Sequence, residues 1–186
     1  MSNYNTVYLL VGPRGSGKSQ YTKGLIERNP SFSIISRDEI LISEFGSTDT
    51  NPYTGAQHYA QEILNQLLRE KLSQEMGIKI ILDTWTGDKE DRQAVIRRLR
   101  GFGATRIIAL YFITPVEQVR EWFWRKPGIA KIAEMREKQG HGFVFFSEDA
   151  PERDYSTFHK LAKGINSDGF YKVIRVNPLE PVVELE

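Results

Sequence analysis

An α/β fold is predicted, with a parallel sheet of about five strands flanked by helices. Short apolar runs of about four to eight residues alternate with longer segments of helical periodicity, a pattern typical of right-handed β–α–β crossovers. The 186 residues suit one domain with a core of its own. Hydrophobic residues make up 40% of the chain and charged residues 26%, which is a globular composition. We therefore expect a single domain over residues 1–176 and an extended surface tail over residues 177–186.

The first strand, the first helix and the second strand follow one another closely. Residues 7–11 form an apolar run, and a glycine-rich turn separates them from a helical stretch that reaches about Glu27. Residues 32–35 are a second short apolar run. The later elements, in chain order, are a helix over 57–75, a strand over 78–82, a helix over 88–100, a strand over 106–113, a helix opening at Pro115, a helix over 154–165 and a strand over 171–176. The expected apolar stripe of the helix over 57–75 consists of Tyr59, Ile63, Leu67 and Leu68.

Two segments break this alternation. Residues 46–55 are polar and predict a surface loop. Residues 126–153 contain two prolines, three glycines and many charges. A long irregular segment in a compact domain is typical of a lid or a binding loop, so we expect a lid over residues 126–153.

Composition excludes several classes of function. Lys and Arg number 25 and Asp and Glu 24, so no net field draws the whole chain to nucleic acid or an anionic membrane, and such binding needs a local patch. The chain has no cysteine, which excludes a disulfide scaffold, a thiolate zinc site and a cysteine nucleophile. No run approaches the roughly 18 apolar residues of a membrane span, and the N-terminus lacks signal-peptide features. We expect a cytoplasmic protein without a membrane partner.

A phosphate-binding motif follows the first predicted strand. It consists of Gly12, Pro13, Arg14, Gly15, Ser16, Gly17, Lys18 and Ser19, which match the pattern G-x-x-x-x-G-K-[ST]. Glycines let the backbone aim N–H groups at phosphate oxygens, and the start of the next helix favours an anion. Lys18 is placed to reach the β- and γ-phosphates, and Ser19 to bind Mg²⁺. The alternative is a chance glycine-rich turn, but the strand before the loop and the helix after it favour a nucleotide site.

Carboxylates follow two other predicted strands. Asp83 ends the apolar run over 78–82, where it would lie beside the phosphate loop and orient Mg²⁺ or its water. The alternative for Asp83 is a cap on the next segment. Asp38 lies just beyond the second strand and is a candidate general base for a hydroxyl nucleophile. The alternative for Asp38 is the N-cap of a helix that starts at Glu39, and both roles are compatible.

These motifs together resemble a known family. The loop over 12–19, Asn29-Pro30, Arg37-Asp38 and Asp83-Thr84 resemble the kinase domain of phage polynucleotide 5′-kinase, and the resemblance extends over roughly residues 6–126. It implies a P-loop kinase fold with a lid over the donor phosphates. It also implies transfer of the γ-phosphate of ATP to a 5′-hydroxyl of nucleic acid, with Mg²⁺ as cofactor.

The resemblance also implies roles for single residues. By position, Lys18 and Ser19 would hold phosphate and Mg²⁺, and Asp38 would be the general base. Asp83 and Thr84 would lie at the acceptor. Arg125 would be the lid arginine that stabilises the transferring charge.

The sequence departs from the family at the acceptor side. Leu41 stands where the family has an arginine that grips the 3′-phosphate of the acceptor. Glu121 stands at the first arginine of the lid pair, although Arg120 adjoins it, and Trp85 replaces an asparagine. Donor chemistry of the same kind but an altered acceptor site is therefore expected. At the mouth of the site, the indole of Trp85 would stack on a base for about 1–3 kcal/mol; the alternative is a core or interface tryptophan.

Two nucleic-acid acceptors fit this pattern. One is a 5′-hydroxyl end, as in the resembled family. The other is the hydroxymethyl group of a modified base such as 5-hydroxymethyluracil, as in related phage DNA kinases. We expect DNA rather than RNA as the substrate and infer no obligate protein partner. A kinase of a small metabolite or free nucleotide is the alternative class. A purely hydrolytic nucleotide switch is a third, against which Asp38 argues, because a switch needs no base for an alcohol.

Overall fold

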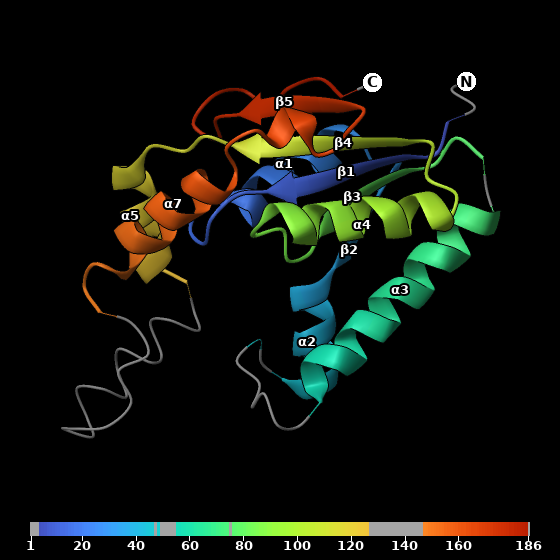
Figure 1. Cartoon of the computed structure of the whole chain (residues 1–186), viewed down its shortest axis with the longest axis horizontal. Helices are drawn as coiled ribbons and strands as arrows, with labels where there is room; N and C mark the ends of the chain where they lie inside the picture. The colour runs from blue at the N-terminus through green and yellow to red at the C-terminus, as the bar shows by residue number, and fades with distance from the viewer. Residues whose placement is uncertain (1–3, 47, 49–54, 75, 127–146, 186) are drawn as a thin grey trace.

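The computed structural model describes residues 4–46, 48, 55–74, 76–126 and 147–185. Its centre is a five-stranded sheet in the order β2-β3-β1-β4-β5, in which all neighbouring strands run parallel (Figure 1). The strands are β1 (Thr6–Val11), β2 (Phe32–Ser36), β3 (Lys79–Asp83), β4 (Arg106–Phe112) and β5 (Lys172–Val176). The predicted α/β class is therefore confirmed.

Helices cover both faces of the sheet (Figure 1). They are α1 (Lys18–Arg28), α2 (Arg37–Phe45), α3 (Ala56–Gln74), α4 (Lys89–Gly101), α5 (Val116–Trp124) and α7 (Ala150–Leu161), followed by the short 3₁₀ helix η2 (Ile165–Ser167). One face packs on α2, α3, α4 and α7 through residues such as Leu64, Ile96 and Phe158. The other face packs on α1 through Tyr21 and Leu25.

Strand β1 lies in the middle of the sheet, and all of its residues are buried. Val7, Leu9 and Val11 face α3 and α4, whereas Tyr8 and Leu10 face α1. Both faces are apolar because helices cover both sides of a parallel sheet. The chain therefore leaves β1 at the centre of the carboxyl edge of the sheet, where such folds bind their ligands.

The apolar stripe expected for the helix over 57–75 is partly wrong. Helix α3 buries Ala60, Leu64 and Leu68, one residue from each turn. Tyr59 and Leu67 are exposed, and the ring of Tyr59 instead meets Phe45 edge-on at 5.9 Å. Small alanines let α3 approach the sheet closely, and a stripe chosen by side-chain size overlooks them.

The two irregular segments fall largely outside the described residues. These are residues 47 and 49–54 of the predicted loop and residues 127–146 of the predicted lid. The helix expected over 154–165 begins earlier, at Ala150, with Pro151 in its first turn. In the C-terminal tail, Val182 packs against the core on the α1 face, and the Val183 N–H donates to the hydroxyl of Tyr21 at 3.0 Å.

Candidate active site

The phosphate-loop motif forms a tight turn between β1 and α1, and its glycines are required by their surroundings. Gly15 has φ +76°, and a Cβ there would lie 2.7 Å from the carbonyl oxygen of Val119 on α5. Gly17 has φ +82°, and a Cβ there would lie 2.6 Å from the ring of Trp122. Left-handed backbone and close packing both exclude a larger residue. Helix α5 therefore packs directly against the loop.

The start of α1 is suited to an anion. Its N-cap is Gly17, which has no side chain to cap the helix, and its first turn holds no acidic residue. No side chain of α1 itself therefore compensates the free N–H groups and the positive end of the helix dipole at this turn. Around the loop, the Ser16 hydroxyl donates to Pro13 O at 2.8 Å, and the Thr114 hydroxyl donates to Ser16 O at 2.8 Å. One bond therefore fixes the loop from within, and the other fixes it to the segment between β4 and α5.

Lys18 is folded back over the loop. Its Nζ donates to Gly12 O at 2.8 Å and to Pro13 O at 2.9 Å. Burial lowers its pKa to about 8, although the nearby Asp83 and Asp38 carboxylates oppose that shift. The two neutral carbonyls do not neutralise the ammonium charge, and the site is partly shielded from water. A phosphate that binds here would supply the negative charge, so the site favours phosphate.

Asp83 and Asp38 belong to the same cluster of charges as Lys18. The register pairs Ser36 of β2 with Asp83 of β3, so both strands end at the same edge of the sheet. Burial raises the pKa of Asp83, while Lys18 lowers it and Asp38 raises it further. The charges of Lys18, Asp83 and Asp38 act on one another, so the three side chains lie near one another beside the loop.

Asp38 does not cap its helix. Helix α2 begins at Arg37, two residues before the predicted start at Glu39, and its N-cap is Ser36, whose hydroxyl accepts from the Glu39 N–H at 3.3 Å. The predicted alternative of an Asp38 cap is therefore wrong, because the serine at the strand end takes that place. Asp38 lies exposed in the first turn of α2, at the positive end of the helix dipole. Its carboxylate is open to an acceptor from solvent.

Trp85 lies in the loop that leaves β3, directly after Asp83 and Thr84. It is 60% exposed, so it is not a core residue. Its Nε1 donates to Asp91 Oδ2 at 2.6 Å, and its ring lies against Gly87, where a Cβ would be 2.5 Å away. The indole is therefore fixed against α4 with much of its surface in solvent.

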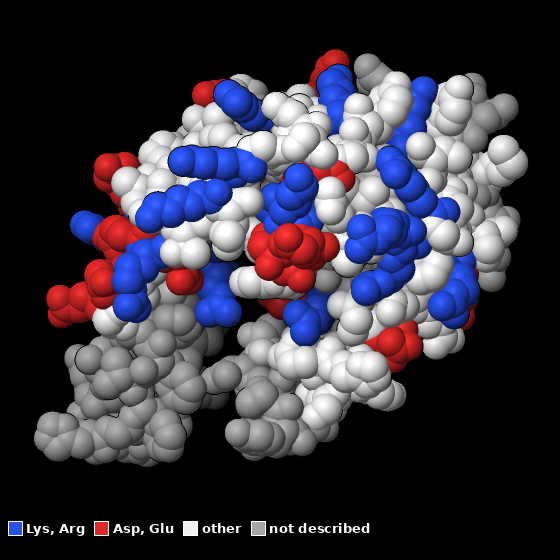
Figure 2. All heavy atoms as spheres, in the orientation of Figure 1, with Lys and Arg blue, Asp and Glu red and all other residues white. Residues whose placement is uncertain are grey.

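The cations expected around the lid are partly described. Arg125 ends α5 and is exposed, and its guanidinium pairs with Glu121 at 2.7 Å. Arg120 pairs with Glu152 of α7, which ties these two helices together. At this end of the molecule, positive and negative side chains alternate on the face shown in Figure 2. The segment over 126–153 contains further basic residues, and Lys131, Arg136 and Lys138 among them lie outside the described residues.

Two further residues lie at the site, although the sequence predicts no specific role for either. Lys126 lies close enough for its charge to lower the pKa of both Lys18 and Asp83. Trp122 covers Gly17 from α5. An aromatic residue one turn before the lid gives only a faint sequence signal, since the same pattern occurs in many amphipathic helices. Leu41, in contrast, is 2% exposed and packs in the core of α2 and α3, so it cannot meet an acceptor.

The donors at the site can be compared with those that Mg²⁺ uses together with a nucleotide. Within the described ranges, no three His, Asp or Glu side chains come together as metal ligands. Mg²⁺ at nucleotide sites is held by one or two protein groups together with substrate phosphates, which suits Ser19 and Asp83. In the part of the chain that the structure describes, no helix is long and apolar enough to cross a membrane.

Known structures with the same fold include several kinases. A chain of a Pnkp1/Rnl/Hen1 RNA repair complex has a TM-score of 0.62 at 18% identity, over 88% of this protein and 47% of that chain. A fungal RNA kinase has a TM-score of 0.53 at 14% identity, over 100% of this protein and 78% of that chain. Shikimate kinase from Acinetobacter baumannii, bound to shikimate, has a TM-score of 0.52 at 17% identity, over 95% of this protein and 86% of that chain. The protein thus spans about half the length of the repair-complex chain. No curated protein matches the sequence.

The family match includes the site and helices on both faces of the sheet. Residues 7–154 match the family described as AAA domain (AAA_33). The match extends from β1 through the phosphate loop and both carboxylates to α7, and it spans well over half of the chain. With its P-loop kinase fold, the protein belongs to this AAA-domain family.

Proposed function

We propose that the protein is an ATP- and Mg²⁺-dependent kinase that transfers the γ-phosphate to a hydroxyl group on nucleic acid. The observation that carries the proposal is the exposed Asp38 carboxylate, which shares one charge cluster with Lys18 and Asp83. A nucleotide switch needs the loop and a Mg²⁺ ligand but has no use for a second carboxylate open to an acceptor.

The proposed reaction is an in-line displacement. The acceptor hydroxyl gives its proton to Asp38, its oxygen bonds to the γ-phosphorus, and the bond from that phosphorus to the β–γ bridging oxygen breaks to release ADP. Lys18 and the N–H groups at the start of α1 hold the phosphate charge that develops. Ser19 and Asp83 would hold Mg²⁺, which would supply positive charge against the phosphates of the nucleotide. Arg125, released from Glu121, adds positive charge at the transferring group.

For the acceptor we propose DNA, through either a 5′-hydroxyl end or the hydroxymethyl group of a base such as 5-hydroxymethyluracil. The exposed indole of Trp85, beside Asp83, supports a base as part of the acceptor. The buried Leu41 favours an acceptor that is not gripped by a 3′-phosphate from this position. The names of the similar structures, an RNA repair complex and an RNA kinase, bring RNA alongside DNA as a substrate to test.

A second candidate is a kinase of a small hydroxylated metabolite or free nucleotide. The near balance of 25 basic and 24 acidic residues and the lack of an arginine at Leu41 favour it. In such a protein Asp38 keeps the same chemical role, and Trp85 would lie over a single small ring.

The experiment is a panel of acceptors incubated with γ-labelled ATP and Mg²⁺. It contains DNA and RNA oligonucleotides with 5′-hydroxyl ends, a 5′-phosphorylated DNA duplex with 5-hydroxymethyluracil, the matching thymine duplex, and free nucleosides. Label in an oligonucleotide supports the proposal, and the comparison of blocked and free ends locates the hydroxyl. Label only in nucleosides supports the second candidate. ATP turnover without label in any acceptor contradicts both.

A further inference from the structure

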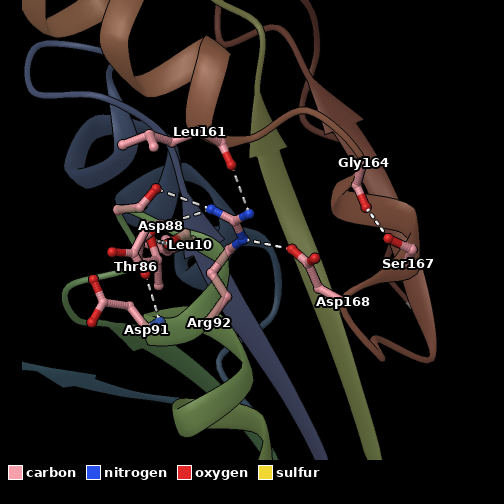
Figure 3. A network of polar contacts seen from close by, with 10 residues as sticks. Leu10, Thr86, Asp88, Asp91, Arg92, Leu161, Gly164, Ser167 and Asp168 are labelled. Atoms are coloured by element: carbon pink, nitrogen blue, oxygen red, sulfur yellow. Dashed lines mark hydrogen bonds and ion pairs between the residues drawn. The ribbon is translucent and has the colours of Figure 1, made fainter.

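A charged side chain is buried in the middle of the fold, at Arg92 of α4. It is fully buried, and its Nε donates to Asp168 Oδ2 at 2.7 Å, which is buried as well (Figure 3). Asp168 follows η2 and is 76 residues away in the sequence. A buried ion pair of this kind is weak evidence for stability, because desolvation of both charges offsets their attraction. Its other contacts indicate what the pair does.

The remaining donors of Arg92 bind backbone carbonyls of two other segments (Figure 3). Its Nη1 donates to Thr86 O at 3.4 Å and to Gly87 O at 3.0 Å, in the loop after β3. Its Nη2 donates to Leu161 O at 3.0 Å, at the last residue of α7. One planar guanidinium therefore joins the loop that carries Trp85, the end of α7 and the segment before β5, which a lysine with one charged nitrogen cannot do.

The loop after β3 has few other attachments. The Thr86 hydroxyl donates to Leu10 O on β1 at 3.3 Å, and Trp85 is bonded to Asp91. Its two carbonyls at residues 86 and 87 are directed to Arg92, so this side chain sets where the loop lies relative to the sheet edge.

Helix α7 connects the same network to the lid side of the site. Its C-terminal end is bound to Arg92, and its N-terminal turn is bound to α5 through Glu152 and Arg120. Helix α5 packs against the phosphate loop at Gly15 and ends at Trp124, with Arg125 as its C-cap. A helix of 12 residues, about 18 Å long, thus links the Trp85 loop to the helix that carries the lid arginine.

We propose that Arg92 is a positioning residue for phosphoryl transfer. It fixes the loop over 84–87 to the end of α7, and so sets the distance between the acceptor side of the site and Arg125, which follows α5. Arg92 touches no substrate and acts through the backbone of Thr86 and Gly87. The kinetic part of this proposal rests on the proposed function, whereas the structural part does not.

The experiment compares Arg92→Lys with Asp168→Asn. Arg92→Lys keeps a charge for Asp168 but loses the bonds to the carbonyls of residues 86, 87 and 161, whereas Asp168→Asn keeps those bonds and loses the charge. Amide hydrogen exchange, read by mass spectrometry, follows the peptides over 84–88 and 158–163. For Arg92→Lys we expect exchange in both peptides to rise by roughly tenfold, beyond any rise in β1, and for Asp168→Asn a smaller rise. Arg97→Lys, exposed on the same helix, is the control and should exchange like the wild type.

Kinetics then separate positioning from stability. With the acceptor that the wild type uses, Arg92→Lys should lower kcat and raise the acceptor KM, about tenfold in kcat/KM, while the Kd for ATP stays within about twofold. The proposal is overturned if Arg92→Lys exchanges like the wild type over 84–88, or if its kcat/KM falls no more than that of Asp168→Asn at an equal loss of stability. If Arg92→Lys does not fold, the same measurements are made on Arg92→Met combined with Asp168→Leu, which removes both charges together. A wild type without any transfer refutes the proposed function, and the exchange result still decides the positioning role.

Discussion

Lys18 provides a prediction that needs no substrate. Its ammonium is held by two carbonyls in a partly buried loop, and burial lowers its pKa from the ordinary 10.5 to about 8. In the window between these values, the unfolded chain holds a proton that the folded protein has released. Stability therefore rises with pH across this window, because the unfolded state binds more protons. Below pH 8 the folded protein carries the full cost of a charge that no phosphate compensates.

The magnitude follows from the two values of the pKa. At pH 7, below both values, the shift costs the folded state about 3 kcal/mol. At pH 9.5, where the folded lysine is neutral and the unfolded one still binds a proton, it costs about 1 kcal/mol. The difference is a gain of about 2 kcal/mol between pH 7 and 9.5. Lys18→Met has no such proton to lose. The unfolding free energy of the wild type should therefore rise by about 2 kcal/mol relative to this variant over that range.

The assay is urea unfolding followed by tryptophan fluorescence, without nucleotide, at steps between pH 7 and 9.5. The comparison uses the difference between wild type and Lys18→Met, so titrations that the two proteins share cancel. Lys23→Met, at an exposed lysine of the same helix, is the control. Its unfolding free energy should change with pH as that of the wild type does. If the unfolding free energies of Lys18→Met and the wild type change equally with pH, the prediction is wrong. That result would mean that the loop does not shield the lysine from water.

Two further predictions concern the loop and the lid. Gly15→Ala should lower stability by at least about 1–2 kcal/mol and abolish ATP binding, because its Cβ would meet Val119 O at 2.7 Å in a left-handed backbone. Gly46→Ala, with φ +74° but nothing within 4 Å, is the matched control, and equal ATP binding by both variants would contradict the prediction in a calorimetric titration. Arg125→Ala should slow phosphoryl transfer about 10³-fold or more and leave the Kd for ATP nearly unchanged. Unaltered turnover would assign the lid charge to another cation, and Lys126 is the first to test.

The sequence was sufficient for the parts of the site that depend on local pattern. A glycine-rich turn between an apolar strand and a helix has few possible structures, and the loop formed as predicted. A carboxylate at the end of a buried strand must lie at the carboxyl edge of a parallel sheet, which places Asp83. The cap of α2 could not be assigned with the same certainty, because Ser36 and Asp38 are both good capping residues and only the backbone decides between them.

What the sequence could not provide depends on contacts between distant segments. Arg92 lies among charged residues of a predicted helix, where an exposed arginine is the ordinary expectation. No neighbouring residue in the sequence indicates that its partner is 76 residues away. The burial of Leu41 depends on how α2 packs on α3. Tyr59 was a reasonable core residue by size, yet the small Ala60 faces the sheet beside it. In each case tertiary packing overrides a local preference.

The most direct test of the account is a single turnover with γ-labelled ATP, Mg²⁺ and a DNA oligonucleotide with a 5′-hydroxyl end, for the wild type and Asp38→Asn. The fractions of label in the oligonucleotide and in free phosphate are measured. We expect it in the oligonucleotide for the wild type, and transfer slowed by roughly 10² to 10⁴-fold for Asp38→Asn with ATP still bound. Label released as phosphate at equal rates in both proteins, with or without acceptor, would contradict a kinase built on Asp38.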